Sequence, residues 1–280
     1  MGTLITPLEL AKLQTNSDPL FIFDCHSSLM DEAAGERAYN EAHIPGAQFA
    51  HLTRDLSGPI EPGKTGRHPL PAKDFFVATL ERWGVTNDST VVAYDDANGA
   101  FAARLWWMMR WVGHPQVHVL NGGLSAWNAA GLPTDATTPE PAASTFSATT
   151  SLCKTISAED LPNSGHFIID ARDQERFDGK VEPIDPIAGH IPGAHCLPFP
   201  QNLTDKMTFK STDDLKARFT WAGITEETQT VCYCGSGVTA THNILALVHA
   251  GYPEPVLYPG SWSEWITDPN RPVATNLSAE

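Results

Sequence analysis

The chain has 280 residues, 41% of them hydrophobic, and carries a formal net charge of −15 at pH 7. This length is enough for one large domain or two ordinary ones, and the acidic balance without a basic patch argues against nucleic acid or a membrane surface as a partner. The sequence holds no apolar run of about 18 residues that would predict a membrane span, and its N-terminus does not resemble a secretory signal. Its five cysteines are too scattered for a disulfide framework, so we expect a reducing, cytoplasmic environment.

Short apolar runs and helix-like segments alternate along the whole chain. In chain order we predict strands at residues 21–24, 91–94, 167–170 and 229–233, a largely apolar helix at 100–112 and a second helix at 241–250. Strands that alternate with helices predict an α/β fold, in which each mainly parallel sheet is covered by helices on both faces. Ligands of such folds bind beyond the carboxyl ends of the strands.

The sequence repeats itself at a spacing near half its length. Four segments recur in the same order, with residues 21–26 matching 167–172, 42–47 matching 189–194, 91–94 matching 230–233, and 119–127 matching 256–265. A stretch rich in proline, threonine and alanine, residues 133–144, separates the halves and is typical of a linker. We therefore predict two tandem domains of one fold, at residues 1–140 and 141–280.

The segment that says most about chemistry follows the predicted strand 229–233 and reads Cys234-Gly235-Ser236-Gly237-Val238-Thr239. The first amides of a helix have no partners within it, so a cysteine at a strand-to-helix turn is placed to be held as a thiolate or as an anionic sulfur adduct. In the first half, Asp95 stands at the matching position, and its loop offers carboxylates in place of a thiol. We therefore expect chemistry in the second half and a structural role for the first.

Two His-Ile-Pro-Gly-Ala segments, at residues 43–47 and 190–194, and the cysteine loop together make the chain resemble two-domain rhodanese-type sulfurtransferases over nearly its whole length. The resemblance implies two tandem rhodanese-like domains, with the catalytic Cys234 in the C-terminal one and without a metal or organic cofactor. Thiosulfate-using members usually carry cations directly after the cysteine. The neutral Gly235-Ser236-Gly237-Val238-Thr239 resembles the 3-mercaptopyruvate branch.

The resemblance also assigns roles to individual residues. Loop residues Gly235, Gly237, Val238 and Thr239 would surround the bound donor. Ser236 would work with His68, a residue of the first domain, in a relay of serine, histidine and aspartate. The aspartate of this relay does not align, and Asp55 is one candidate for it.

Recognition of the donor carboxylate is the part that departs from the family pattern. The arginine of an Arg-Phe pair corresponds to Arg176, whose alternative role is a surface ion pair. A second arginine usual in the mercaptopyruvate branch is replaced by Asp185, and Arg172 or Lys180 would have to compensate.

The resemblance implies a two-step transfer in which Cys234 takes sulfur from a small-molecule donor as a persulfide and passes it to a thiol such as thioredoxin or glutathione, or to cyanide. A thiosulfate:cyanide sulfurtransferase stays open as the alternative, and a non-catalytic sulfur carrier or regulatory protein is a remote one. A phosphatase or arsenate reductase needs an arginine six residues after the cysteine, where this chain has Ala240.

Other cysteines and histidines are candidates for metal binding, redox chemistry or a structural role. Cys232 and Cys234 form only a Cys-x-Cys pair without further metal-ligand spacing, which argues against a zinc site. Cys25 and Cys153 are either redox-active or plain unreactive thiols. His43 and His190 recur in both halves, including the half without the thiol loop, which favours a structural role.

Overall fold

The computed structural model describes residues 2–16 and 18–277, which form two compact units. One unit comprises Met1–Gly58, Pro71–Leu152 and Asp205–Phe209, and the other comprises Pro59–Leu70, Cys153–Thr204 and Lys210–Glu280. The structure thus moves the main boundary from the predicted residue 140 to residue 152. It also exchanges two short segments, so that His68, which we expected in the first domain, belongs to the second unit.

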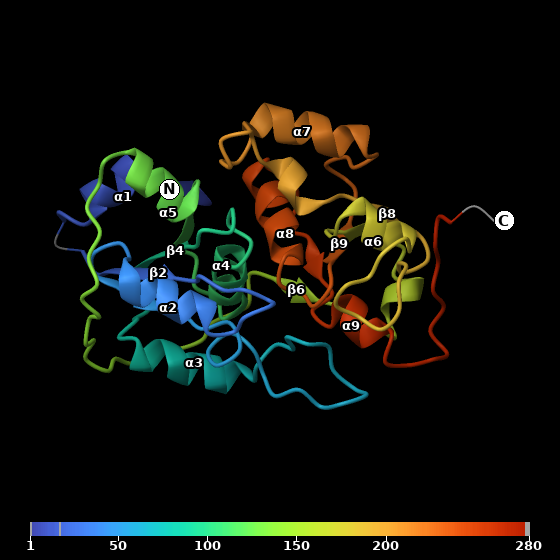
Figure 1. Ribbon diagram of the computed structural model, residues 1–280, viewed down its shortest axis with the longest axis horizontal. Coiled ribbons are helices and arrows are strands. Elements are labelled where there is room, and N and C mark those ends of the chain that lie inside the picture. The colour runs from blue at the N-terminus through green and yellow to red at the C-terminus, as the bar shows by residue number, and fades with distance from the viewer. Residues whose placement is uncertain (1, 17, 278–280) are drawn as a thin grey trace. The chain divides into compact units, whose positions relative to one another are not determined.

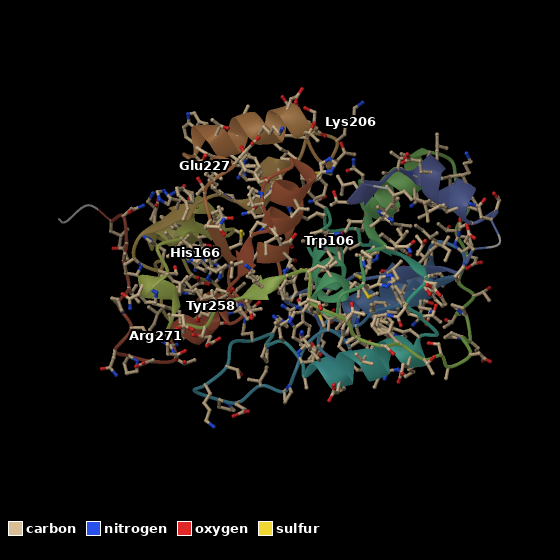
Figure 2. The ribbon with its side chains drawn as sticks, turned by 180° about the vertical axis from the view of Figure 1, so that it is seen from behind. Trp106, His166, Lys206, Glu227, Tyr258 and Arg271 are labelled. Carbon is tan, nitrogen blue, oxygen red and sulfur yellow. The ribbon has the colours of Figure 1, made fainter. Side chains whose placement is uncertain are left out.

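The first unit is built on a five-stranded sheet in which every strand pair is parallel. The strand order is β1-β5-β4-β2-β3, with β1 at Leu4–Ile5, β2 at Leu20–Asp24, β3 at Ala47–Phe49, β4 at Thr90–Tyr94 and β5 at Val117–Leu120. Its helices are α1 (Pro7–Leu13), α2 (Ala34–Glu41), α3 (Lys73–Arg82), α4 (Ala102–Trp111) and α5 (Gly123–Ala129) (Figure 1). The apolar helix predicted at residues 100–112 corresponds to α4, whose Trp106, labelled in Figure 2, is fully buried.

The second unit repeats this architecture with the strand order β6-β10-β9-β7-β8, again all parallel. Its strands are β6 (Lys154–Thr155), β7 (Phe167–Asp170), β8 (Ala194–Cys196), β9 (Thr230–Tyr233) and β10 (Val256–Leu257). Its helices are α6 (Gln174–Asp178), α7 (Thr212–Trp221), α8 (Ala240–His249) and α9 (Ser261–Trp265), with short 3-10 turns at Leu161–Asn163 and Phe199–Asn202. The predicted α/β fold of two domains with mainly parallel sheets is confirmed.

Each repeated His-Ile-Pro-Gly-Ala segment ties an edge of its sheet to the end of the central strand. His43 donates through Nδ1 to the carbonyl of Tyr39 and stacks on the Tyr39 ring, and His190 does the same with Phe177. The next amide along the chain, in both copies, donates to the hydroxyl of the tyrosine that ends the central strand. Both histidines are therefore structural, as the repeat predicted.

The register of the second sheet places the functional loop at its carboxyl edge. Asp170 at the end of β7 pairs in register with Tyr233 at the end of β9, and Cys234 follows directly. Helix α8 follows, and its residues 240–247 are all buried, from the polar Thr241 to the apolar Ile244 and Leu245. Within the described part of the chain, no helix has the length and apolarity that crossing a bilayer requires.

Candidate active site

Cys234 lies in the turn between β9 and α8 and is 2% exposed. The beginning of α9 holds this turn from one side, because the Cys234 amide donates to the Ser261 hydroxyl at 3.1 Å and the Cys234 carbonyl accepts from the Trp262 amide at 2.9 Å. The Ser261 hydroxyl donates in turn to the carbonyl of Tyr258, the residue that follows β10 and is labelled in Figure 2. The sulfur-bearing residue is thus fixed by two neighbouring strand ends and a helix.

Two glycines of the loop are required for different reasons. Gly237 has a φ of +76°, and a Cβ atom there would lie 2.2 Å from the Pro259 carbonyl oxygen, so any side chain would collide with backbone. A Cβ atom on Gly235 would lie 2.9 Å from the guanidinium of Arg67 and 3.6 Å from that of Arg176. Gly237 therefore lets the chain curl around the sulfur, and Gly235 leaves room for two cations beside it.

The matching loop of the first unit shows what such a turn binds. The buried Asp95 carboxylate accepts hydrogen bonds from four backbone amides, those of Ala97, Gly99, Phe101 and Ala102, each at 2.8 Å. The Asp95 carboxylate is thus a built-in anion, held by the backbone amides of the turn and of the helix that follows.

The second unit offers a corresponding set of amides without a built-in carboxylate. The repeat matches Ala97, Gly99 and Phe101 with Ser236, Val238 and Ala240. Among the described residues, none accepts a hydrogen bond from the amides of these last three positions. The Cys234 loop therefore presents unoccupied amide donors where the first unit binds its own carboxylate, which suits a negatively charged sulfur adduct.

Ser236 and His68 are brought together although 168 residues separate them. The Ser236 hydroxyl lies 2.8 Å from Nδ1 of His68, and Ser236 is 4% exposed. The segment that carries His68 is anchored to the second unit by the Arg67 amide, which donates to the Ser263 hydroxyl at 3.1 Å. This pair can pass a proton between the loop and the imidazole.

Asp55, the candidate for the third member of the relay, has other partners. Its buried carboxylate accepts from the His51 amide at 2.9 Å, from Arg82 at 2.8 Å and from Arg54 at 3.2 Å, all within the first unit. These contacts give Asp55 a structural role in its own unit.

Arg176 lies beside the loop and is oriented by two carboxylates. It donates to Glu182 through Nε at 3.0 Å and Nη2 at 2.7 Å, and Nη2 lies 3.4 Å from Asp185. These partners replace the surface ion pair that we considered as its alternative role. Burial tends to raise the pKa of Glu182, but the hydrogen bond from Arg176 and two backbone amides lower the pKa below the ordinary glutamate value. Glu182 is thus held charged and keeps Arg176 in place.

Sequence reasoning missed Arg67, which belongs to the same charged cluster. Its guanidinium forms a close ion pair with Asp185, and it lies over Gly235 as described above. The available signal was a cation next to the predicted catalytic histidine, in Gly66-Arg67-His68. Because Arg67 is far from the cysteine loop in the sequence, its proximity to Gly235 could not be predicted.

Arg172 does not fit the substrate-binding role that we predicted for it. It is 3% exposed, donates to Asp170, Glu182 and the Gly189 carbonyl, and stacks on Trp262 at 4.8 Å. Burial alone would lower the pKa of Arg172, but the adjacent Asp170 carboxylate raises it above the ordinary arginine value. A buried guanidinium with all these partners braces the strand end. Lys180, the other suggested substitute, pairs with Asp178 at 2.8 Å.

Burial favours the protonated thiol in three of the other cysteines. Burial raises the pKa of Cys25 and of Cys232, and it raises the pKa of Cys196 to about 12. The Cys153 thiol donates to Glu254 at 3.4 Å. Within the described residues none of the five cysteines forms a disulfide, and no cluster of three or more His, Cys, Asp or Glu side chains is arranged to hold a metal ion.

Comparison with known proteins places both halves of the chain in one family. Residues 6–130 and 155–268 match the Rhodanese model, described as a rhodanese-like domain. A Pseudomonas aeruginosa protein named "Probable 3-mercaptopyruvate sulfurtransferase" is 48% identical over 97% of this chain and 98% of its own. A Gallus gallus protein named thiosulfate sulfurtransferase is 36% identical over 84% of this chain and 82% of its own.

Solved structures show the same relationship. SseA from Escherichia coli, described with the rhodanese fold of 3-mercaptopyruvate sulfotransferases, is 31% identical with a TM-score of 0.82 over 94% of this chain and 100% of that one. The 3-mercaptopyruvate sulfurtransferase from Leishmania major is 32% identical with a TM-score of 0.83 over 94% of this chain and 74% of that one. The relatives agree on sulfur transfer, and their names differ in the sulfur donor.

Proposed function

The chain belongs to the rhodanese-like family, and we propose that it is a sulfurtransferase that takes sulfur from 3-mercaptopyruvate on Cys234. The observation that carries this proposal is the arrangement around that thiol. Unoccupied backbone amides face the position that a carboxylate fills in the first unit, a Ser236–His68 pair stands beside it, and guanidinium groups lie next to Gly235.

In the first step the Cys234 thiolate attacks the sulfur of 3-mercaptopyruvate. A sulfur–sulfur bond forms as the carbon–sulfur bond breaks, and its electron pair leaves with the carbon as the enolate of pyruvate. The enolate takes up one proton to become pyruvate, and the hydroxyl of Ser236, hydrogen-bonded to His68, is placed to deliver it. The cysteine is left as a persulfide.

The loop amides stabilise the persulfide as they would any anion. Once the outer sulfur loses its proton it carries a negative charge, which the amides of Ser236, Val238 and Ala240 can share. The four amide hydrogen bonds to Asp95 illustrate how strongly a turn of this kind holds a charge.

In the second step an acceptor removes the outer sulfur. A thiolate such as that of glutathione or thioredoxin attacks it, the sulfur–sulfur bond breaks, and its electron pair returns to Cys234 as thiolate. Cyanide would take the sulfur in the same way and leave as thiocyanate. The absence of a disulfide among the described cysteines suits the reducing cytoplasm in which these acceptors are found.

Thiosulfate is the second candidate donor, and one observation favours it. Two guanidinium groups lie beside Gly235, and a dianion has enough acceptor oxygens to bind both. In that reaction sulfite leaves, and no carbon has to be protonated.

The test is steady-state sulfur transfer to cyanide, with kcat/KM compared for 3-mercaptopyruvate and thiosulfate in one buffer. We expect a higher kcat/KM for 3-mercaptopyruvate. Mass spectrometry of the protein after reaction with the donor should show a gain of one sulfur atom, located on the peptide that contains Cys234. Cys234→Ser should lose both signals. Turnover by Cys234→Ser would contradict the assignment, and a preference for thiosulfate would select the second candidate. Failure to form a persulfide with either donor would leave the sulfur-carrier or regulatory interpretation.

A further inference from the structure

Two guanidinium groups from distant parts of the sequence converge beside the cysteine loop. Arg67 lies in the segment Pro59–Leu70 and Arg176 in α6, yet both have a terminal nitrogen within 4 Å of the point where a Cβ atom on Gly235 would stand. Like charges so close repel unless carboxylates lie between them. Asp185 supplies this link, because its two oxygens face Arg67 and Arg176 respectively.

A local turn places Asp185 for this purpose. One oxygen of Glu182 accepts the backbone amides of Ile184 and Asp185, each at 3.1 Å, while the same carboxylate binds Arg176. The Asp185 side chain is 3% exposed and therefore points into the cluster. The residue that replaces an expected arginine thus holds another arginine, 118 residues earlier in the sequence.

Arg67 is the most exposed arginine of this cluster and keeps a hydrogen-bond donor that no described residue accepts. Its side chain is 27% exposed, compared with 12% for Arg176 and 1% for Arg172. Its Nη1 faces Asp185, whereas among the described residues no acceptor is found for Nη2, the atom nearest Gly235. A donor aimed at the loop without an acceptor is suited to an anionic ligand.

We propose that Arg67 binds the carboxylate of the sulfur donor together with Arg176, and that Asp185 is the positioning residue for Arg67. This inference rests on the proposed function and names the residue that supplies the second cation. The cluster also selects the kind of anion. The charges of Arg67 and Arg176 are balanced by Glu182 and Asp185, so a singly charged carboxylate is tolerated better than a dianion.

The experiment compares Cys234 alkylation by iodoacetate and by iodoacetamide, which share the reacting group and differ in the carboxylate. We expect Arg67→Ala to lower the rate constant for iodoacetate relative to that for iodoacetamide about 10-fold, because one charge-assisted hydrogen bond to the carboxylate is lost. Iodoacetamide should react at an unchanged rate, which also reports that the loop is folded. In steady-state assays the KM for 3-mercaptopyruvate should rise about 10-fold or more while kcat changes little.

Two matched variants complete the test. Lys64 is an exposed cation of the same segment that pairs with Glu61, and Lys64→Ala should leave the rate ratio unchanged. Arg67→Lys keeps the positive charge but lacks the planar guanidinium, so it should restore part of the rate ratio that Arg67→Ala loses. A rate ratio in Arg67→Ala equal to that of the wild type, whether neither rate constant falls or both fall equally, would overturn the inference. Because alkylation does not depend on turnover, a chain that alkylates as expected but transfers no sulfur would refute the proposed function alone.

Discussion

The two loops that follow the central strands, one after β4 and one after β9, are the same structure used in opposite ways. In the first unit Asp95 turns its carboxylate back into the turn and satisfies four amides. In the second unit Cys234 stands at the matching position, and the amides of Ser236, Val238 and Ala240 find no acceptor among the described residues. The comparison teaches that the anion-binding turn belongs to the fold, and that one side chain decides whether it is closed or available.

The variant expected to have the largest effect closes the second loop in the manner of the first. Cys234→Asp should abolish persulfide formation, a loss of about a thousandfold or more in turnover, because the nucleophile is gone. Its carboxylate should also take up the free amides and raise the melting temperature. Cys234→Ser is the matched control, equally inactive but without the added anion. A melting temperature for Cys234→Asp below that of Cys234→Ser would break the comparison.

Opening the first loop should be costly in stability. Asp95→Ala leaves four buried amides without their acceptor, and we expect a loss of about 3 kcal/mol in the free energy of unfolding. Urea titration measures the loss, and hydrogen exchange should localise it to the amides of Phe101 and Ala102. Asp96→Ala, which removes the neighbouring carboxylate that binds Ser125, serves as control. Similar stability of Asp95→Ala and wild type would show that water can replace the carboxylate.

A third variant gives the active loop the residue of the inactive one at a single position, since Ser236 matches Ala97. Ser236→Ala should lower kcat for 3-mercaptopyruvate about 100-fold by removing the proton donor for the enolate. Transfer from thiosulfate, which needs no such proton, should change little. Equal loss with the two donors, measured by thiocyanate formation, would assign Ser236 to loop structure.

The smallest expected effect concerns the residues two positions beyond the ends of β2 and β7, His26 and Arg172. His26 binds Asp24 through Nδ1 at 2.5 Å, as Arg172 binds Asp170. Burial tends to lower the pKa of His26, but Asp24 and neighbouring carboxylates raise it above the ordinary value of 6.5. A raised pKa in the folded state stabilises the protein below pH 6.5, and this contribution is lost as the pH rises through the folded-state value.

His26→Gln should therefore destabilise the first unit by roughly 1 kcal/mol at about pH 5.5 and by less at about pH 8.5. Urea titrations at the two pH values provide the measurement, and the exposed His195 gives the control variant His195→Gln. The second unit should show no such dependence from Arg172, which stays charged throughout. A penalty independent of pH would mean that His26 acts through packing alone.

Much of this molecule could be read from local patterns. The duplicated segments predicted two parallel α/β domains, and the strand–cysteine–helix pattern at residues 229–250 located the loop. These features depend on neighbours in sequence or on the periodicity of buried positions, so they survive without tertiary information. The pairing of Arg172 with the end of β7 is also local. The residue type, an arginine, suggested substrate binding, and only its burial in the structure revealed a structural role.

Contiguous residues were enough to predict the fold, its duplication and the place of the Cys234 loop. The resemblance predicted that Ser236 would work with His68. Only the packing of the whole chain showed that Pro59–Leu70 belongs to the second unit and that Asp185 holds Arg67 beside Gly235. The physical reason is that these contacts join segments more than a hundred residues apart, and which long-range contacts form depends on how the whole chain packs rather than on either segment alone.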